Sequence, residues 1–270
     1  MQDISLSVAA VQMVSGLSVQ DNLQQAAHGI AQAAQGGARL IALPEYFCFM
    51  GRHDQDKLAL AETPGDGPIQ DFLAQQAQQH GVWLVGGTLP LRSPDAHRIY
   101  NACLVYGPQG DLCARYDKIH LFGFQKGAES YDESVAIRPG DAPPQVFELP
   151  FGRVALGICY DLRFPEFFRA QGEVRLMVLP AAFTYTTGSV HWEVLLRARA
   201  IENQCYVLAS AQGGVHENGR RTWGHSMLID PWGDVLSRLP EGPGIAAGVL
   251  DAARLASVRQ SLPALRHRVM

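Results

Sequence analysis

One stretch of the sequence decides the fold, and it reads Arg153-Val154-Ala155-Leu156-Gly157-Ile158-Cys159-Tyr160-Asp161-Leu162-Arg163-Phe164-Pro165-Glu166. Its apolar residues alternate up to Ile158 as in a buried strand, and Phe164-Pro165-Glu166 is typical of a helix that opens with proline near its first turn. Cys159 is therefore expected where a strand becomes a turn, with its side chain pointing out of the sheet and the following N–H groups able to face an oxyanion. The alternative is a small buried core thiol, because free cysteine is among the most buried residue types.

The chain before this stretch alternates strands with helices. We expect strands over residues 4–13, 40–43 and 82–85. Ser18 caps a helix between the first two strands, and a second helix over residues 68–80 precedes the third strand. This alternation predicts a layered α/β fold rather than a sandwich or a bundle.

The middle of the chain has a different character. Two strands, over residues 99–106 and 112–116, are joined by the turn composition Gly107-Pro108-Gln109-Gly110, so the sheet is expected to be mixed. Residues 121–144 are rich in glycine and proline with little periodicity, which is typical of a functional loop in a compact domain. Beyond Cys159 the pattern predicts a helix, a strand over 176–179, a helix over 189–203, a strand over 206–209 and further strands between about 224 and 250.

Composition bounds the class of protein. The 270 residues carry no Pro/Gly/Ser-rich or charged stretch that would mark a linker, so we expect a single domain over residues 1–270. Charged residues make up 18% of the chain, below the roughly 25% of an average soluble protein, which predicts extensive burial that includes a subunit interface. The net charge of -4 gives no basic footprint for nucleic acid and no cationic face for a membrane, which favours a small-molecule partner.

Targeting signals and metal motifs are absent from the sequence. The N-terminus lacks the charged and apolar regions of a signal peptide, and no apolar run approaches the roughly 18 residues of a membrane span, so we expect a cytoplasmic protein. Five cysteines, an odd number without a secretory signal, argue against disulfides. No Cys-x-x-Cys pair and no histidine pair has zinc-ligand spacing, so no structural metal is expected. No Gly-x-Gly-x-x-Gly follows a first strand, which argues against dinucleotide binding.

A catalytic cysteine needs a base or a cation beside it, because the thiolate is the nucleophilic form. Two residues are unusual candidates: Glu45 follows the apolar run 40–43 and Pro44, and Lys118 stands between apolar residues. Taken alone, a carboxylate after a strand is most often a solvated turn residue, and a lysine among apolar residues most often extends its ammonium into solvent. Together with Cys159, they also form a set in which buried charges are balanced.

Three sequence blocks resemble the signature blocks of the nitrilase superfamily, the carbon-nitrogen hydrolases. They are Leu43-Pro44-Glu45, Asp117-Lys118-Ile119-His120-Leu121-Phe122 and Gly157-Ile158-Cys159-Tyr160-Asp161-Leu162-Arg163-Phe164-Pro165-Glu166, and their order and spacing also match. The resemblance extends over essentially the whole chain. It implies an α/β fold, namely an α-β-β-α sandwich with two mixed sheets that pairs into a homodimer or a higher oligomer. It also implies a Glu-Lys-Cys triad at Glu45, Lys118 and Cys159.

The same resemblance implies a mechanism. A second glutamate, hydrogen-bonded near the lysine, falls on Glu133, with Glu129 as a nearby rival. Glu45 would take the thiol proton, the thiolate would attack an amide carbonyl, and Lys118 with the N–H of Tyr160 would hold the oxyanion. Water activated by the same glutamate would then hydrolyse the thioester. No metal or organic cofactor is required at any step.

Substrate recognition is expected around Arg163. In related amidases the matching arginine binds a substrate carboxylate, a role that suits its fork of donors. The alternative is an ion pair of Arg163 with Glu166 or Asp161. Phe183 and Thr184 are candidates to line the pocket, and their alternative is ordinary loop packing.

Two later stretches, residues 191–207 and 223–233, resemble most closely the branch of deaminated glutathione amidases, which act in metabolite repair. The implied reaction is hydrolysis of deaminated glutathione to 2-oxoglutarate and cysteinylglycine. The related omega-amidases hydrolyse 2-oxoglutaramate, which presents the same keto-acid end, and residues 123–134 are expected to discriminate between the two substrates. Hydrolysis of N-carbamoyl amino acids or of nitriles, and a role as a non-enzymatic interaction partner, are the remaining alternatives.

Overall fold

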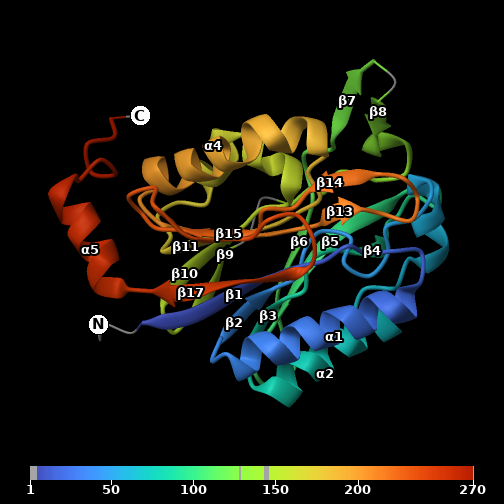
Figure 1. Cartoon of the computed structure of the whole chain (residues 1–270), viewed down its shortest axis with the longest axis horizontal. Helices are drawn as coiled ribbons and strands as arrows, with labels where there is room; N and C mark the ends of the chain where they lie inside the picture. The colour runs from blue at the N-terminus through green and yellow to red at the C-terminus, as the bar shows by residue number, and fades with distance from the viewer. Residues whose placement is uncertain (1–4, 128, 143–145, 270) are drawn as a thin grey trace.

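The computed structural model describes residues 5–127, 129–142 and 146–269, and two sheets form its centre (Figure 1). The first sheet has the order β17 (Gly244–Leu250), β1 (Leu6–Gln12), β2 (Leu40–Ala42), β3 (Trp83–Val85), β5 (Ile99–Tyr106) and β4 (Leu89–Arg92), with β6 (Leu112–Asp117) also paired to β5. The second sheet has the order β16 (Val235–Arg238), β15 (Met227–Ile229), β12 (Tyr206–Ala211), β11 (Leu176–Ala181), β10 (Gly152–Leu156) and β9 (Val146–Leu149).

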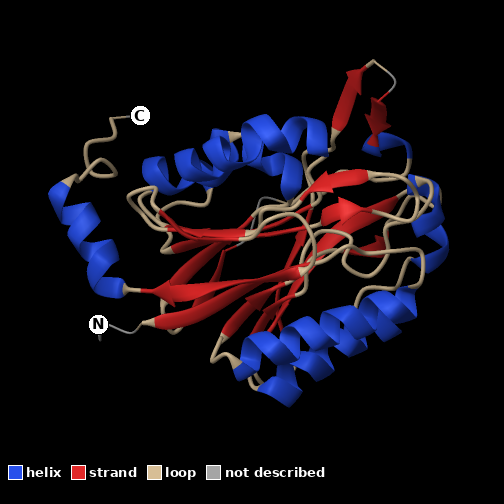
Figure 2. Ribbon diagram, viewed as in Figure 1, coloured by secondary structure: helices blue, strands red, loops and turns tan. Residues whose placement is uncertain are grey.

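Both sheets are mixed and helices cover their outer faces. Strands β1, β2 and β3 are parallel, as are β10, β11 and β12, while β17, β5, β9 and β15 run antiparallel to their neighbours. On one side lie α1 (Val19–Gln35) and α2 (Pro68–His80), and on the other α3 (Pro165–Ala170) and α4 (Tyr185–Asn203), as Figure 2 shows. The prediction of an α-β-β-α sandwich with two mixed sheets is confirmed.

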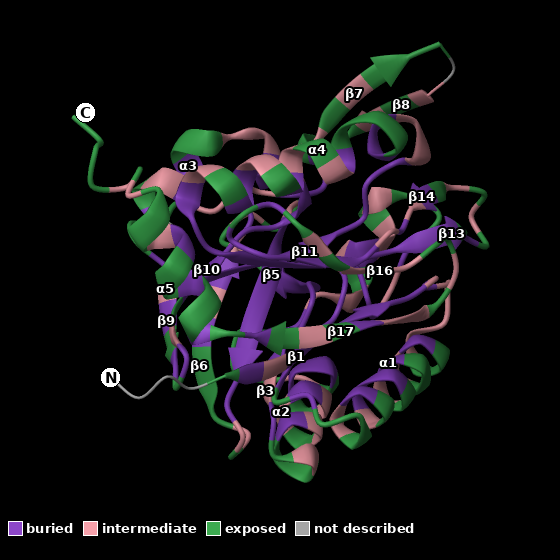
Figure 3. Ribbon diagram, turned by 60° about the vertical axis from the view of Figure 1, so that its left-hand side comes forward, coloured by how far each residue is buried: buried purple, intermediate pink, exposed green. Residues whose placement is uncertain are grey.

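Strand β1 explains how one sheet serves two apolar layers. Val8 and Ala10 face the core between the sheets, and Ala9 and Val11 face the core beneath α1 and α2. Successive side chains of a strand point to opposite faces, so a strand buried on both sides must be apolar throughout. The buried strands at the centre of Figure 3 show the result. Ser210 of β12 also donates a hydrogen bond to the carbonyl of Val11, which joins the two sheets directly.

The local signals for the first two helices are confirmed. The hydroxyl of Ser18 accepts a hydrogen bond from the N–H of Asp21 at 3.2 Å, so α1 begins with the expected cap. α2 spans the predicted residues 68–80 and ends at Gly81, whose φ of 60° is the left-handed conformation that terminates many helices.

Helix α4 begins at Tyr185, four residues before the predicted start at Ser189. The threonines and the glycine of this first turn have low helix propensity, which is why the pattern places the start later. Two contacts override that propensity. The hydroxyl of Thr184 caps the N–H of Thr187, and Gly188 packs so closely on Trp223 that an added Cβ would lie 2.3 Å from the Cβ of that tryptophan.

The region predicted to be an aperiodic loop, residues 121–144, contains a hairpin instead. Strands β7 (Gly123–Lys126) and β8 (Glu129–Asp132) pair antiparallel and project from the body of the molecule beside α4 (Figure 1). The hairpin is largely exposed and its short strands lack a continuous apolar face, so period-two patterning is weak there. Pro143 and Pro144 lie outside the described residues.

Several short elements were not indicated by the sequence. They are β4, β9, β13 (Gly213–Val215), β14 (Arg221–Trp223), the 3-10 turns η1 (Asp54–Leu60), η2 (Glu133–Val135) and η3 (Cys159–Arg163), and α5 (Ala252–Ser261). None of the helices in the described ranges has the length and apolar character needed to cross a membrane.

Candidate active site

Cys159 lies on the sharp turn that the sequence indicates. It follows β10 and opens η3, where its φ of 47° falls in the left-handed region that residues other than glycine rarely adopt. Backbone conformations of this kind cluster where a functional group must be held in one orientation. The side chain is 7% exposed and lines a cavity, so it is enclosed but not sealed within the core.

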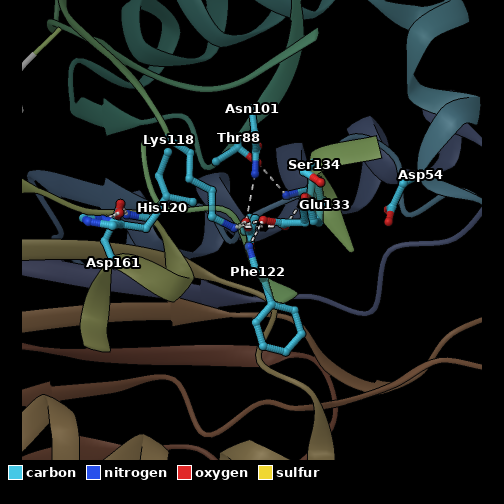
Figure 4. Close-up of polar contacts among 12 residues, drawn as sticks. Asp54, Thr88, Asn101, Lys118, His120, Phe122, Glu133, Ser134 and Asp161 are labelled. Carbon is cyan, nitrogen blue, oxygen red and sulfur yellow. Dashed lines mark hydrogen bonds and ion pairs between the residues drawn. The ribbon is translucent and has the colours of Figure 1, made fainter. Parts of the chain in front are cut away.

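Asp161 holds this turn in place. The fully buried carboxylate accepts hydrogen bonds from the N–H of Ile158 and the hydroxyl of Tyr116, each at 2.8 Å. Its second oxygen lies 2.7 Å from Nδ1 of His120, a contact visible in Figure 4. Tyr116 belongs to β6 and His120 lies just beyond Lys118. Asp161 is therefore a structural cap that ties the cysteine turn to the lysine segment.

The ammonium of Lys118 lies between two carboxylates, those of Glu45 and Glu133, and Figure 4 shows the contact with Glu133. Its Nζ is 2.9 Å from Oε1 of Glu45, and 3.0 and 2.8 Å from the two oxygens of Glu133. All three side chains are buried. Burial alone lowers the pKa of an ammonium, but the two carboxylates outweigh it and raise the pKa of Lys118 well above its usual range. The site therefore contains a permanently charged donor.

The two oxygens of Glu45 have different surroundings. Oε1 accepts hydrogen bonds from Lys118 and, at 2.9 Å, from the side-chain amide of Asn101. Oε2 is buried and has no donor among the described residues. Buried polar atoms in native proteins are nearly always paired, and an exception calls for an explanation. Oε2 is thus an unpaired, buried carboxylate oxygen beside the lysine. Asn101, which lies within β5, carried no sequence signal for this arrangement.

Glu133, and not its rival Glu129, is the glutamate bonded to the buried lysine. It also accepts hydrogen bonds from the hydroxyl of Tyr46 at 2.8 Å and from the N–H of Phe122 at 2.7 Å. Glu129 lies on β8 and accepts a hydrogen bond from the hydroxyl of Thr186 at 3.0 Å instead. Both oxygens of Glu133 are thus occupied by donors. The sequence did not predict the involvement of Tyr46, because the family motif ends at the preceding residue, Glu45.

The electrostatic surroundings keep the thiol protonated. Burial raises the pKa of Cys159 well above its usual range and the charge of Glu45 raises it further, while Lys118 offsets only part of this effect. A thiolate can therefore form only as a base removes the proton during attack.

Cys159 opens onto a cavity that contains the other residues expected to bind substrate. The lining residues are Phe122, Cys159, Tyr160, Arg163, Ala182, Phe183, Thr184 and Thr187. Phe183 follows β11 and Thr184 caps α4, so the end of one strand and the first turn of one helix form a wall of the cavity.

The guanidinium of Arg163 is held by neutral groups. It donates a hydrogen bond to Nδ1 of His191 at 3.2 Å, and its central carbon lies 5.6 Å from the ring centre of Tyr160 and 5.4 Å from that of Phe183. Within the described ranges, neither acidic residue considered above forms an ion pair with it, so the ion-pair alternative is wrong. His191, which the sequence did not mark as part of the site, is brought in by the face of α4.

No three histidine, cysteine, aspartate or glutamate side chains converge as metal ligands within residues 5–127, 129–142 and 146–269. All five cysteines are free thiols, and Cys113 is exposed while the other four are buried.

Comparison with known proteins places this geometry in context. The sequence profile described as "Carbon-nitrogen hydrolase" matches residues 7–260. The deaminated glutathione amidase of Synechocystis sp. is 42% identical over 266 residues, covering 97% of each chain. The human omega-amidase NIT2 is 36% identical over 267 residues, covering 98% of this chain and 95% of its own. The crystal structure of the C. elegans NitFhit protein superposes with a TM-score of 0.91 at 36% identity, covering all of this chain and 66% of that one.

Proposed function

The chain belongs to the carbon-nitrogen hydrolase family and is a cysteine-dependent amidohydrolase, and from that premise we propose that it hydrolyses deaminated glutathione to 2-oxoglutarate and cysteinylglycine. One observation carries the choice of a substrate with a keto-acid carboxylate. Arg163 lines the same cavity as Cys159 and is held by a histidine and two aromatic rings, which leaves its charge available for a substrate carboxylate. The similarity to deaminated glutathione amidases supports this assignment.

In the proposed first step, Sγ of Cys159 attacks the amide carbonyl while its proton passes to Oε2 of Glu45. The bond between sulfur and carbon forms, and the carbonyl electron pair moves onto oxygen. The free Oε2 and the raised pKa of the thiol support a transfer coupled to attack, because a thiolate would not persist in this environment.

The tetrahedral oxyanion is stabilised by donors that are in place before its charge develops. In the proposal these are the ammonium of Lys118 and the N–H of Tyr160. Glu133 holds the ammonium with both of its oxygens, which supports a positioning role for this second glutamate. Collapse of the intermediate breaks the C–N bond, and Glu45 returns the proton to the leaving amine.

A thioester on Cys159 remains, and water completes the cycle. Glu45 takes a proton from the water as the water oxygen bonds to the thioester carbon. The C–S bond then breaks, Glu45 gives the proton to the sulfur, and the thiol is regenerated as the free acid leaves. In this proposal Arg163 binds the keto-acid carboxylate, while Tyr160, Phe183 and Thr184 enclose the chain between that carboxylate and the reacting carbon.

A second candidate substrate is 2-oxoglutaramate, because the chain is also 36% identical to the human omega-amidase NIT2. Both substrates carry the same keto-acid end, so Arg163 serves either. They differ in the leaving group, which is cysteinylglycine in one case and ammonia in the other. The hairpin β7–β8 stands next to the first turn of α4 through the contact between Glu129 and Thr186, which supports our proposal that this segment selects the leaving group.

The test is 2-oxoglutarate formation from each substrate at matched concentration, followed with a coupled dehydrogenase. A kcat/KM that is higher for deaminated glutathione supports the main proposal. A higher value for 2-oxoglutaramate supports the second candidate, and no product from either rules out both.

We also propose that the protein is a cytoplasmic homodimer with one catalytic domain. Val190 and Val194 of α4 are each 66% exposed, and an apolar surface of this kind suits a subunit interface. The five free thiols suit a reducing compartment. Light scattering coupled to size-exclusion chromatography measures the oligomeric state.

A further inference from the structure

Tyr46 directly follows the proposed base and contacts the second glutamate. Its hydroxyl lies 2.8 Å from Oε1 of Glu133, and its side chain is 4% exposed. Its φ of 57° is left-handed, and its N–H donates to the hydroxyl of Thr88 at 2.9 Å. A bulky residue in this conformation is strained, so the surrounding structure must hold it there. The strain allows Glu45 and Tyr46, although adjacent, both to contribute to the same buried cluster.

A second buried lysine supports the ring of Tyr46. Lys57 is 1% exposed, and its Nζ lies 4.1 Å from the centre of the tyrosine ring and 2.6 Å from Oδ1 of Asp54. A cation over an aromatic face is attracted by the ring, and more strongly where water is excluded. Lys57 therefore fixes the ring and withdraws electron density from it, which makes the hydroxyl a better donor.

We propose that Tyr46 and Lys57 are positioning residues of the amidase reaction, which act through Glu133 to present Lys118 to the oxyanion. This inference rests on the proposed function for the role of Lys118. Neither residue touches the cavity beside Cys159 among its described lining residues, so neither is a catalytic residue.

The charges of the cluster give the physical reason. Two carboxylates, Glu45 and Glu133, share one ammonium, so the buried set carries an excess negative charge that must be dispersed. The hydroxyl of Tyr46 takes up part of the charge on Glu133 Oε1, the same oxygen that Lys118 contacts at 3.0 Å. Without the hydroxyl, Glu133 would draw the ammonium more strongly and leave less of its charge for the oxyanion and for the thiol.

Burial raises the pKa of Tyr46 well above its usual range, and the charges of Glu133 and Glu45 add to this effect. The phenol is therefore neutral at neutral pH and keeps its proton for the hydrogen bond to Glu133.

The principal variant is Tyr46→Phe, which removes only the hydroxyl. We expect kcat to fall about tenfold, since a hydrogen bond to a charged group is among the stronger ones, while KM stays within about twofold. The matched control is Tyr206→Phe, which removes the hydroxyl of another buried tyrosine, one that bonds to the backbone of Asp251. The control should lose a similar amount of thermal stability and keep kcat.

The second readout does not depend on the substrate. The rate of alkylation of Cys159 by iodoacetamide, measured from pH 6 to 9, should shift to higher pH in Tyr46→Phe, because less of the Lys118 charge reaches the thiol. If Tyr46→Phe keeps both the kcat and the alkylation profile of the wild type, the inference is overturned. It is also overturned if kcat falls only in proportion to lost folded protein and the alkylation profile is unchanged.

Lys57 is tested together with its partner, because Lys57→Met alone would leave Asp54 with a weakened counter-charge. In an otherwise wild-type protein, the double substitution Asp54→Asn/Lys57→Met should lower kcat severalfold. Added to Tyr46→Phe, the same double substitution should lower kcat little further. Lys57→Arg should keep most of the activity. Equal losses in both backgrounds would show that Lys57 does not act through Tyr46. If the wild type hydrolyses neither keto-acid amide, the proposed function fails, and the alkylation profiles still decide the role of Tyr46.

Discussion

The side-chain amide of Asn101 lies 2.9 Å from Oε1 of Glu45, and this contact determines which oxygen of the carboxylate remains without a donor. Glu45 stands in the loop after β2, whereas Asn101 belongs to β5, so a strand of the same sheet orients the proposed base. Lys118 contacts the same oxygen, and the two donors together lock the plane of the carboxylate.

Replacing Asn101 by Ala should lower kcat by about tenfold or more with little change in KM, because a carboxylate free to rotate presents the wrong oxygen for part of the time. Steady-state kinetics with the better substrate provides the measurement. Asn203→Ala is a suitable control, since Asn203 is also buried and its amide donates to Arg199 and Glu202 of α4, away from the lining of the cavity beside Cys159. A normal kcat in Asn101→Ala would show that Lys118 alone orients the base.

Replacing Cys159 by Ala should abolish amide hydrolysis and leave the fold intact, whereas the exposed Cys113→Ser should retain full activity. In the wild type, iodoacetamide should modify Cys159 before Cys48 and Cys205, because Cys159 opens onto a cavity, whereas Cys48 and Cys205 are enclosed in the core at 1% and 0% exposed. Mass spectrometry of peptides after timed labelling gives the order. Labelling of Cys159 no faster than of the other two would favour a non-enzymatic role.

Replacing Arg163 by Ala should raise KM for keto-acid amides by about a hundredfold and leave KM for a neutral amide nearly unchanged, since a bidentate contact between an arginine and a carboxylate is worth a few kcal/mol. Arg163→Lys should recover part of the loss. His191→Ala should raise KM less, because it removes only the group that orients the guanidinium. Equal effects on acidic and neutral amides would contradict the proposed carboxylate site.

Acidification should destabilise the fold through His216. Burial lowers the pKa of this histidine below its usual 6.5, and its ring nitrogens contact the carbonyl of Ser15 and the hydroxyl of Thr222, each at 2.8 Å. The unfolded chain therefore binds a proton below about pH 6.5 that the folded protein does not, so the stability from the neutral ring is present above that pH and declines below it by at most about 1.4 kcal/mol per unit.

The measurement is the urea midpoint at pH 7 and at pH 5.5. His216→Gln keeps a donor and an acceptor but cannot titrate, so its midpoint should change less between the two pH values. A variant with the same pH dependence as the wild type would show that other groups account for the effect.

Three residues of the site could be found from the sequence. Glu45, Lys118 and Cys159 follow recognisable strands, which made them candidates, and the resemblance of their sequence blocks to the carbon-nitrogen hydrolases selected them. Asn101, Tyr46 and His191 could not, because each contributes through a partner far away in sequence and none has a local pattern. Their positions follow from strand order and helix rotation, which are properties of the assembled fold.

The fold likewise has features that local sequence signals predict and features that depend on distant contacts. α2 was predicted with its bounds, because proline opens it and glycine in a left-handed conformation ends it. The start of α4 was missed, since it depends on how Gly188 packs against Trp223, 35 residues later in the chain, and not on helix propensity. The hairpin β7–β8 was missed because its strands are short and exposed.

The site is also divided between the two sheets: Glu45 and Lys118 follow β2 and β6 of the first, and Cys159 follows β10 of the second. A partly folded chain in which each sheet has formed but the two have not docked would have native secondary structure and no functional active site. Enzymatic activity is therefore a reporter of sheet docking. During refolding, activity should return with the burial of the core between the sheets and lag behind the recovery of the far-ultraviolet circular dichroism signal.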